Sequence, residues 1–227
     1  MLKQIVLLGA LILPQALFAA DGSSWPDAFA RRSYKLGMTL ADFRATPYPD
    51  TKDWPTAYAV CSDEPRAASY PYQSDVSVSK DWREAGVIAC TFFFESGPNK
   101  MVYSAGLILG DIPSQTKFYF IRATQDSEPR LFYITSGGPT AKYPDLLATF
   151  TQALGKPSSV KSDVVQNRLG ATFKNDVATW SNTSSKVIVT RYGDTIYVLQ
   201  VEHVLTPLWK VLESGLDTGR ADKAKKL

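Results

Sequence analysis

The chain has 227 residues, and its 25 basic and 22 acidic side chains leave a formal charge of +3. This balance excludes a strongly basic nucleic-acid binder, and hydrophobic and aromatic contents of 44% and 12% exclude a disordered chain. The chain is therefore expected to fold around a core and to have no nucleic-acid partner.

Residues 1–20 have the pattern of a secretory signal peptide, with an apolar run over 5–13 and small residues at the expected cleavage point. The run is shorter than the roughly 20 residues that a membrane-spanning helix needs. We expect cleavage after Ala19 or Ala20, no lipid-bearing cysteine and no transmembrane segment. The mature protein is expected to be soluble in a bacterial periplasm or, in a eukaryotic host, in the secretory route.

A short helix is predicted directly after residue 39. Thr39 suits the N-cap because its hydroxyl can accept a hydrogen bond from the backbone N–H of Asp42. Leu40 and Phe43 give the helix an apolar side, and Pro47 disfavours helix soon afterwards. So short a helix must pack on another element to be stable.

Strands are predicted over 85–94, 117–123 and 129–135, which are rich in β-branched and aromatic residues. A second, amphipathic helix is expected between Pro144 and Gly155, since proline suits the first helical position and glycine the end. Its apolar face is expected to pack on the sheet.

Three further runs, 171–182, 185–193 and 194–204, have the spacing of an antiparallel meander. A closing helix is expected from Thr206 to Gly215. The predicted fold class is α+β, with short helices packed on an antiparallel sheet.

The order of these elements suggests a tandem pseudo-repeat with a boundary near Gly137, Gly138 and Pro139. This divides the mature chain into an N-terminal half over 21–138, a C-terminal part over 139–215 and a basic flexible tail over 216–227. The halves either share one continuous sheet or form two.

Cys61 and Cys90 are the only cysteines, and an even pair in an exported chain predicts one structural disulfide. Neither a C-x-x-C redox motif nor a cysteine–histidine cluster with zinc-like spacing is present. No metal and no cofactor are therefore expected.

The sequence offers few candidates for catalysis. His203 is the single histidine, and its position in a strand pattern predicts a satisfied, partly buried side chain. Paired carboxylates remain as an alternative, drawn from a scattered set: Asp75, Asp81, Glu84, Glu95 and Asp111.

Four aromatic residues lie in proline-rich sequence with little strand character: Trp25, Trp54, Tyr70 and Tyr72. Exposed together, they could bind a partner protein or a sugar. The alternative is that they cover one end of the sheet.

The stretch LGMTLADFR, residues 36–44, resembles the helix start of the small outer-membrane assembly lipoproteins, the SmpA/OmlA family, and of the β-lactamase-inhibitor-like fold. LGKPS, residues 154–158, with a following W-x-N-x-x-S-x-h-x-h pattern, resembles a second copy of that layout, carried by Trp180, Asn182, Ser185, Val187 and Val189. The resemblance implies helices on one face of an antiparallel sheet and binding to other proteins of the envelope. The segment 50–84 has no counterpart in it.

We therefore expect a periplasmic binding or interaction protein without catalysis, whose partner is another envelope protein. The alternatives are a carboxylate-dependent hydrolase and a carrier of a small apolar ligand. The first hypothesis predicts an exposed apolar or aromatic patch on the sheet face that the helices leave uncovered.

Overall fold

The structure is a computed structural model that describes residues 25–224, with side chains described as far as Gly219. The predicted signal peptide and its cleavage point lie outside the described residues. The main strands are β3 (Tyr58–Cys61), β4 (Ile88–Ser96), β5 (Met101–Ala105), β6 (Leu107–Leu109), β7 (Ile112–Ile121), β8 (Arg130–Pro139), β9 (Ser159–Gln166), β10 (Thr172–Ser181), β11 (Ser185–Thr190) and β12 (Val198–Leu205).

These strands form one sheet in the order β3-β4-β7-β8-β12-β11-β10-β9, with β5 paired to β4 and β6 paired to β7. Every pairing is antiparallel, which confirms the α+β class. A separate hairpin joins β1 (Ala30–Arg31) and β2 (Tyr34–Lys35). The helices are α1 (Leu40–Ala45), α2 (Gln73–Val76), α3 (Lys80–Glu84), α4 (Tyr143–Leu154) and α5 (Thr206–Ala224), with 3-10 turns η1 (Pro65–Ala68) and η2 (Thr140–Lys142).

Strand β8 lies in the middle of this sheet, between β7 and β12. The glycines that suggested a boundary, Gly137 and Gly138, are inside β8: Gly137 pairs with Gln115 of β7 and Gln200 of β12, and Gly138 pairs with Leu199 of β12. A Cβ on Gly138 would lie 3.4 Å from the Ile112 side chain, so neighbouring side chains pack around this position. The two halves therefore share one continuous sheet.

Helix α1 forms as predicted. The Thr39 Oγ1 accepts a hydrogen bond from the Asp42 N–H at 3.0 Å, and the helix ends at Ala45, with Thr46 as its C-cap. Leu40 and Phe43 are both buried. The local signals of the sequence, a capping hydroxyl and a following proline, are sufficient to place this helix.

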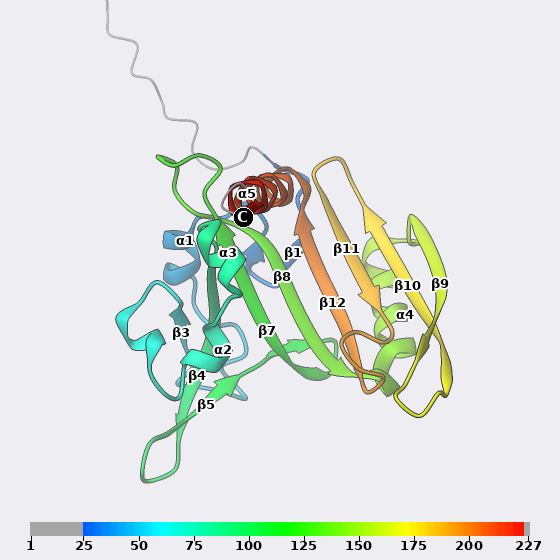
Figure 1. The fold of residues 1–227 in the computed structure, drawn as a ribbon. Coiled ribbons are helices and arrows are strands. Elements are labelled where there is room, and N and C mark those ends of the chain that lie inside the picture. Colours follow the sequence, from blue (N-terminus) through cyan, green and yellow to red (C-terminus); the bar gives the residue numbers. More distant parts are fainter. Residues whose placement is uncertain (1–24, 225–227) are drawn as a thin grey trace, which may run out of the picture.

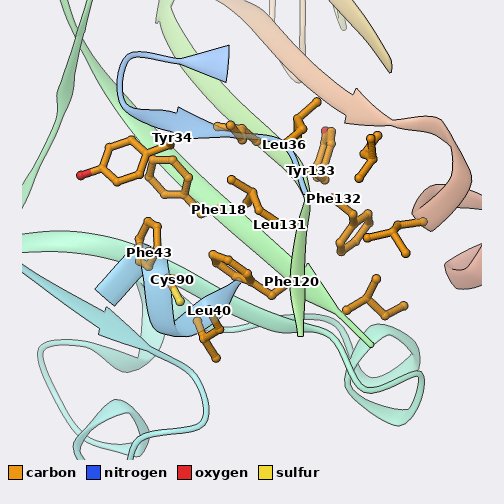
Figure 2. Close-up of a cluster of buried hydrophobic side chains, with 14 of the residues drawn as sticks. Tyr34, Leu36, Leu40, Phe43, Cys90, Phe118, Phe120, Leu131, Phe132 and Tyr133 are labelled. Carbon is orange, nitrogen blue, oxygen red and sulfur yellow. The ribbon is translucent and has the colours of Figure 1, made fainter. Parts of the chain in front are cut away.

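The main core lies where α1, the β1–β2 hairpin and α5 meet the sheet (Figure 1). Figure 2 shows Phe43 of α1 beside Tyr34 of β2, with Phe118, Phe120 and Leu131 from the sheet around them. The Phe43 ring centroid is 5.3 Å from that of Tyr34 and 5.0 Å from that of Phe118. This aromatic cluster holds the short helix in place.

Helix α4 packs on the far side of the meander in Figure 1 and forms a second core with β10, β11 and β12. Pro144 lies in its first turn, and Gly155 follows its last residue with a φ of 80°, in the left-handed region that favours glycine. The Trp180 indole N–H donates to the Gly155 carbonyl at 2.8 Å. The predicted helix, its end and its apolar face are confirmed.

Helix α5 is longer than predicted. The sequence places its end at Gly215 and a flexible tail after it, but the helix continues to Ala224. Leu208, Leu212 and Leu216 all pack against the main core, so the apolar stripe continues past the glycine. A glycine inside a helix costs only about 1 kcal/mol, which this packing offsets. Within residues 25–224 no helix is both long and apolar enough to cross a membrane.

Candidate functional site

The segment 50–84 contributes the edge strand β3, which pairs with β4, and carries η1, α2 and α3. It forms a small core of its own with the sheet, made of Val60, Ala67, Val76 and Phe93. The segment for which the family resemblance offers no counterpart is therefore a packed part of the protein.

A disulfide joins this segment covalently to β4. Cys61 of β3 is the cross-strand partner of Cys90 of β4, with Cα atoms 4.0 Å apart, and the two are bonded. The prediction of a disulfide is confirmed. The next residue, Ser62, donates its N–H to the Ala89 carbonyl at 2.8 Å and accepts the Ala89 N–H on its Oγ at 3.0 Å.

A groove of about 700 Å³ lies between the segment and the start of β4. Its apolar lining comes from Ala67, Ala68, Val76, Val78, Val87 and Ile88. Its polar lining comes from Ser62, Asp63, Gln73, Ser74, Ser77 and Arg83. An apolar surface with a few polar groups around it is the usual construction of a binding site.

Helix α3 forms one wall of the groove. The Ser79 Oγ caps it by accepting the Trp82 N–H at 3.3 Å. The Trp82 ring packs against Tyr119 of β7 at 5.2 Å and Trp209 of α5 at 6.2 Å between ring centroids. Because Trp82 anchors α3 on the sheet and on α5, the next side chain, Arg83, is held at the groove.

Helix α2 forms the opposite wall. The Asp75 carboxylate accepts a hydrogen bond from the Ser104 hydroxyl of β5, and Val76 is buried. Just before α2, the Tyr72 ring meets Phe93 edge-on at 4.9 Å, and its hydroxyl shares a 3.0 Å hydrogen bond with that of Tyr58. The wall is therefore tied to three strands.

The four aromatic residues singled out in the sequence do not gather in one place. Trp25 and Trp54 pack against the main core, and Tyr72 packs on Phe93 as described above. Tyr70 is 86% exposed and lies in the loop between η1 and α2, which both line the groove. Among the four, Tyr70 is the one whose side chain is exposed.

Asp63 and Glu64 lie beside the disulfide and, with Cys61, bring three potential ligand atoms within 4.8 Å of one another. The Cys61 sulfur is bonded to Cys90 and offers no thiolate. The Arg44 Nη2 lies 2.7 Å from the Asp63 Oδ1, and the Arg66 Nε lies 2.8 Å from the Glu64 Oε2. Both carboxylates therefore already have cationic partners. This arrangement suits an ion-pair network better than a metal site.

His203 is not placed to act as a general base, because its side chain is buried. It is 2% exposed, with its ring centroid 6.3 Å from that of Phe150 in α4. Burial, assisted by the nearby charge of Arg31, lowers the pKa of His203 to about 3. Its Nδ1 has no hydrogen-bond partner among the described residues, so the prediction of a satisfied, partly buried histidine is wrong.

The five carboxylates considered for hydrolysis do not line the groove. Asp111 pairs with Lys142 at 2.8 Å, and this hydrogen bond and charge hold the pKa of the Asp111 carboxyl below its ordinary value. Asp75 binds Ser104, and Glu84 lies 3.8 Å from Lys80. Asp111, Asp75 and Glu84 therefore each contact a different partner residue.

The sheet face opposite α4, at the front of Figure 1, is not the apolar patch that the sequence predicts. One row across β7, β8, β12, β11 and β10 consists of Lys117, Thr135, Glu202, Ile188 and Thr179. All five are half-buried. The sheet face is mixed in character, and the apolar groove lies instead beside the segment 50–84.

Comparison of the chain with protein-family models, with curated proteins and with solved structures found no match. The resemblance to the SmpA/OmlA family therefore stays a prediction. The groove has to be interpreted from its own residues, none of which is a histidine, a cysteine or a glutamate. The sequence did not predict it, because its walls come from segments that give no periodic signal.

Proposed function

We propose that this protein is exported to the periplasm and acts there as a non-catalytic interaction protein of the cell envelope. Its groove between α2, α3 and β4 holds an apolar segment of another envelope protein. The observation that carries this proposal is the groove itself, with its apolar lining and polar margin. The predicted signal peptide and the disulfide support an exported protein.

Arg83 in the groove lining and Tyr70 in the adjoining η1–α2 loop are the residues best suited to bind a partner. Tyrosine and arginine are over-represented among the residues that dominate binding energy at protein interfaces. Tyr70 is largely exposed beside the groove, and Arg83 is held at it by the anchoring of Trp82. A partner segment with apolar side chains and an acidic residue would satisfy both.

The groove residues favour binding over hydrolysis. The Oγ of Ser62 is occupied as an acceptor of the Ala89 N–H, and neither a histidine nor a second carboxylate besides Asp63 lines the groove. Asp63 in turn pairs with Arg44. A nucleophile beside a base, which covalent catalysis requires, is not formed by these residues.

Site-specific photo-crosslinking in intact envelopes tests the proposal. In the test variant a photoreactive amino acid replaces Ser74, which is exposed and lines the groove. In the control variant the photoreactive amino acid replaces Thr183, which is exposed in the β10–β11 turn. We expect the Ser74 position to crosslink one envelope protein and the Thr183 position to leave it unlabelled. Mass spectrometry identifies the product.

A groove-filling variant makes the test specific. Ala68 is exposed and lines the groove, so Ala68→Trp fills it, whereas Ala123→Trp places the same ring in the exposed β7–β8 turn. The crosslink should be lost in the first variant and kept in the second. Equal crosslinking in both would contradict the proposal, and a small apolar molecule released from the purified protein in place of a crosslink would establish the carrier instead.

A further inference from the structure

Strand β9 is a long, open edge of the sheet. Its eight residues, Ser159–Gln166, pair in unbroken register with β10, and no strand described here lies on its other side (Figure 1, right). Proteins commonly protect such edges with prolines, bulges or very short strands. Strand β3 at the opposite edge has only four residues, whereas β9 has eight, with no proline and no bulge, and its charged residues are one lysine and one aspartate.

One backbone hydrogen bond shows which β9 residues direct their N–H and C=O groups toward β10 and which direct them outward. The Asn167 N–H donates to the Ala171 carbonyl at 2.9 Å, in the same register as the rest of the pair. Because backbone groups alternate in direction along a strand, the odd-numbered residues of β9 bond to β10. The even-numbered residues Val160, Ser162 and Val164 therefore point their N–H and C=O groups outward.

The side chains of β9 also alternate between two faces. Val160 is the cross-strand partner of Ala178, which belongs to the core under α4, so Val160 and Val164 face the α4 side. They are 59% and 69% exposed, which is high for valine. Lys161 and Asp163 are exposed on the opposite face.

We propose that β9 pairs with β9 of a second copy of this chain, antiparallel and centred on Ser162. In this register Lys161 lies opposite the partner subunit's Asp163, and by symmetry the same pair forms twice. Val160 lies opposite the partner subunit's Val164, again twice. The strand is thus complementary to itself in both charge and apolar character, as a two-fold interface requires.

The backbone selects the same register as the side chains. Outward-pointing residues must pair with outward-pointing residues, so Val160, Ser162 and Val164 form the hydrogen-bonded pairs. Lys161 and Asp163 then fall at the non-hydrogen-bonded positions, where opposite side chains are closest. Sliding the strand by the smallest permitted step places either Lys161 opposite Lys161 or Asp163 opposite Asp163, which like-charge repulsion disfavours.

The pairing also covers apolar surface on the α4 side. Leu154, the last residue of α4, is 37% exposed on the helix that covers this face. Val160 and Val164 lie on the same side of the sheet. The two copies would bring these residues together across the two-fold axis. This interface is at the opposite end of the sheet from the groove, so it does not rest on the proposed function.

Sedimentation velocity over a concentration series tests the dimer and its charge pairs. Lys161→Asp and Asp163→Lys each replace two attractive pairs by repulsive ones and should raise the dimer dissociation constant by about tenfold or more. The double variant K161D/D163K restores opposite charges and should dimerise as the wild type does. Mixing the two single variants should give a heterodimer, because each then faces its complement.

A cysteine crosslink tests the register. Ser162 residues of the two copies would form a hydrogen-bonded pair with Cα atoms about 5.5 Å apart, within disulfide range. Ser162→Cys should therefore give a disulfide-linked dimer on oxidation. Ser159→Cys, whose two copies would lie roughly 20 Å apart, should not.

Val164→Pro tests the backbone contribution without disturbing β10. Its N–H points outward, so proline should abolish dimerisation while circular dichroism and thermal unfolding of the monomer stay close to those of Val164→Thr. A wild-type protein that stays monomeric at all concentrations would overturn the proposal. Equal crosslinking of the Ser159→Cys and Ser162→Cys variants, or failure of the mixed single variants to associate, would overturn the register.

Discussion

Cys61 lies directly opposite Cys90 in the β3–β4 pair, and the disulfide between them fastens the groove-forming segment to the sheet. Closure of a loop of this length contributes about 3–4 kcal/mol in the chain-entropy description. We expect the double variant Cys61→Ala and Cys90→Ala to lose about that much free energy of unfolding. Hydrogen exchange should increase mainly over residues 50–84. Two alkylated cysteines in native protein without reductant would contradict the pairing.

The cap of α1 gives a smaller and more local prediction. Thr39→Ala removes the acceptor for the Asp42 N–H and should lower the free energy of unfolding by about 1 kcal/mol in chemical denaturation. Thr39→Ser keeps the acceptor and serves as the matched control. Equal loss in both variants would show that the Thr39 methyl group, and not the hydrogen bond, is responsible.

Phe43 should matter more than Thr39, because its side chain is 1% exposed and surrounded by Tyr34, Phe118 and Phe120. Phe43→Ala leaves a cavity and should cost about 3–5 kcal/mol of unfolding free energy. Binding of the partner proposed for the groove, measured well below the melting transition, should be unchanged. Unchanged stability with lost binding would mean that α1 presents this ring to the partner.

Substitutions near the end of α5 are expected to raise the free energy of unfolding. A Cβ on Gly215 would lie 3.5 Å from the Ala85 Cβ, an ordinary van der Waals contact, and the residue is inside a helix. Gly215→Ala should therefore stabilise the protein by about 0.5–1 kcal/mol. Gly219→Ala, with open space around the added atom, should do the same. Destabilisation by either variant would indicate that the helix stops near Gly215.

His203 predicts a pH dependence of stability. The folded protein holds its pKa near 3, whereas an unfolded histidine titrates near 6.5, so the unfolded state takes up the proton first as pH falls. The stability associated with the neutral imidazole is present above pH 6.5 and is lost as pH falls from there toward 3. The slope is at most about 1.4 kcal/mol per pH unit.

His203→Leu should remove this slope. Urea unfolding of wild type and variant between pH 7 and pH 5.5, above the range of ordinary carboxylates, isolates the effect. Parallel pH profiles for the two proteins would show that His203 takes up no proton on unfolding in this range.

The features predicted correctly are those with a local chemical signal. Thr39 caps, Pro144 starts and Gly155 ends a helix whatever lies elsewhere in the chain, and β10 and β11 carry β-branched and aromatic residues between turn sequences. Strand β9 gave no such signal because both of its faces are largely exposed, so apolar residues do not alternate with polar ones.

The groove could not be predicted for a different reason. Its walls, α2 and α3, are one turn or slightly more in length and form only because Val76 and Trp82 pack on strands that lie elsewhere in the chain. The positions of Gly137 and Gly138 could not be predicted for the same reason. Only the pairing of β8 with its neighbouring strands shows that these glycines lie within a sheet and not in a linker.

The central position of β8 has a consequence for biogenesis. Its Tyr133 lies between Tyr119 of β7 and Val204 of β12, and the Trp209 ring of α5 closes over it at 5.2 Å. An emerging chain cannot complete this layer until its C-terminal part, which carries β12 and α5, has also emerged. Folding should therefore be completed late, with the β8 edge unpaired and prone to aggregation until β12 arrives.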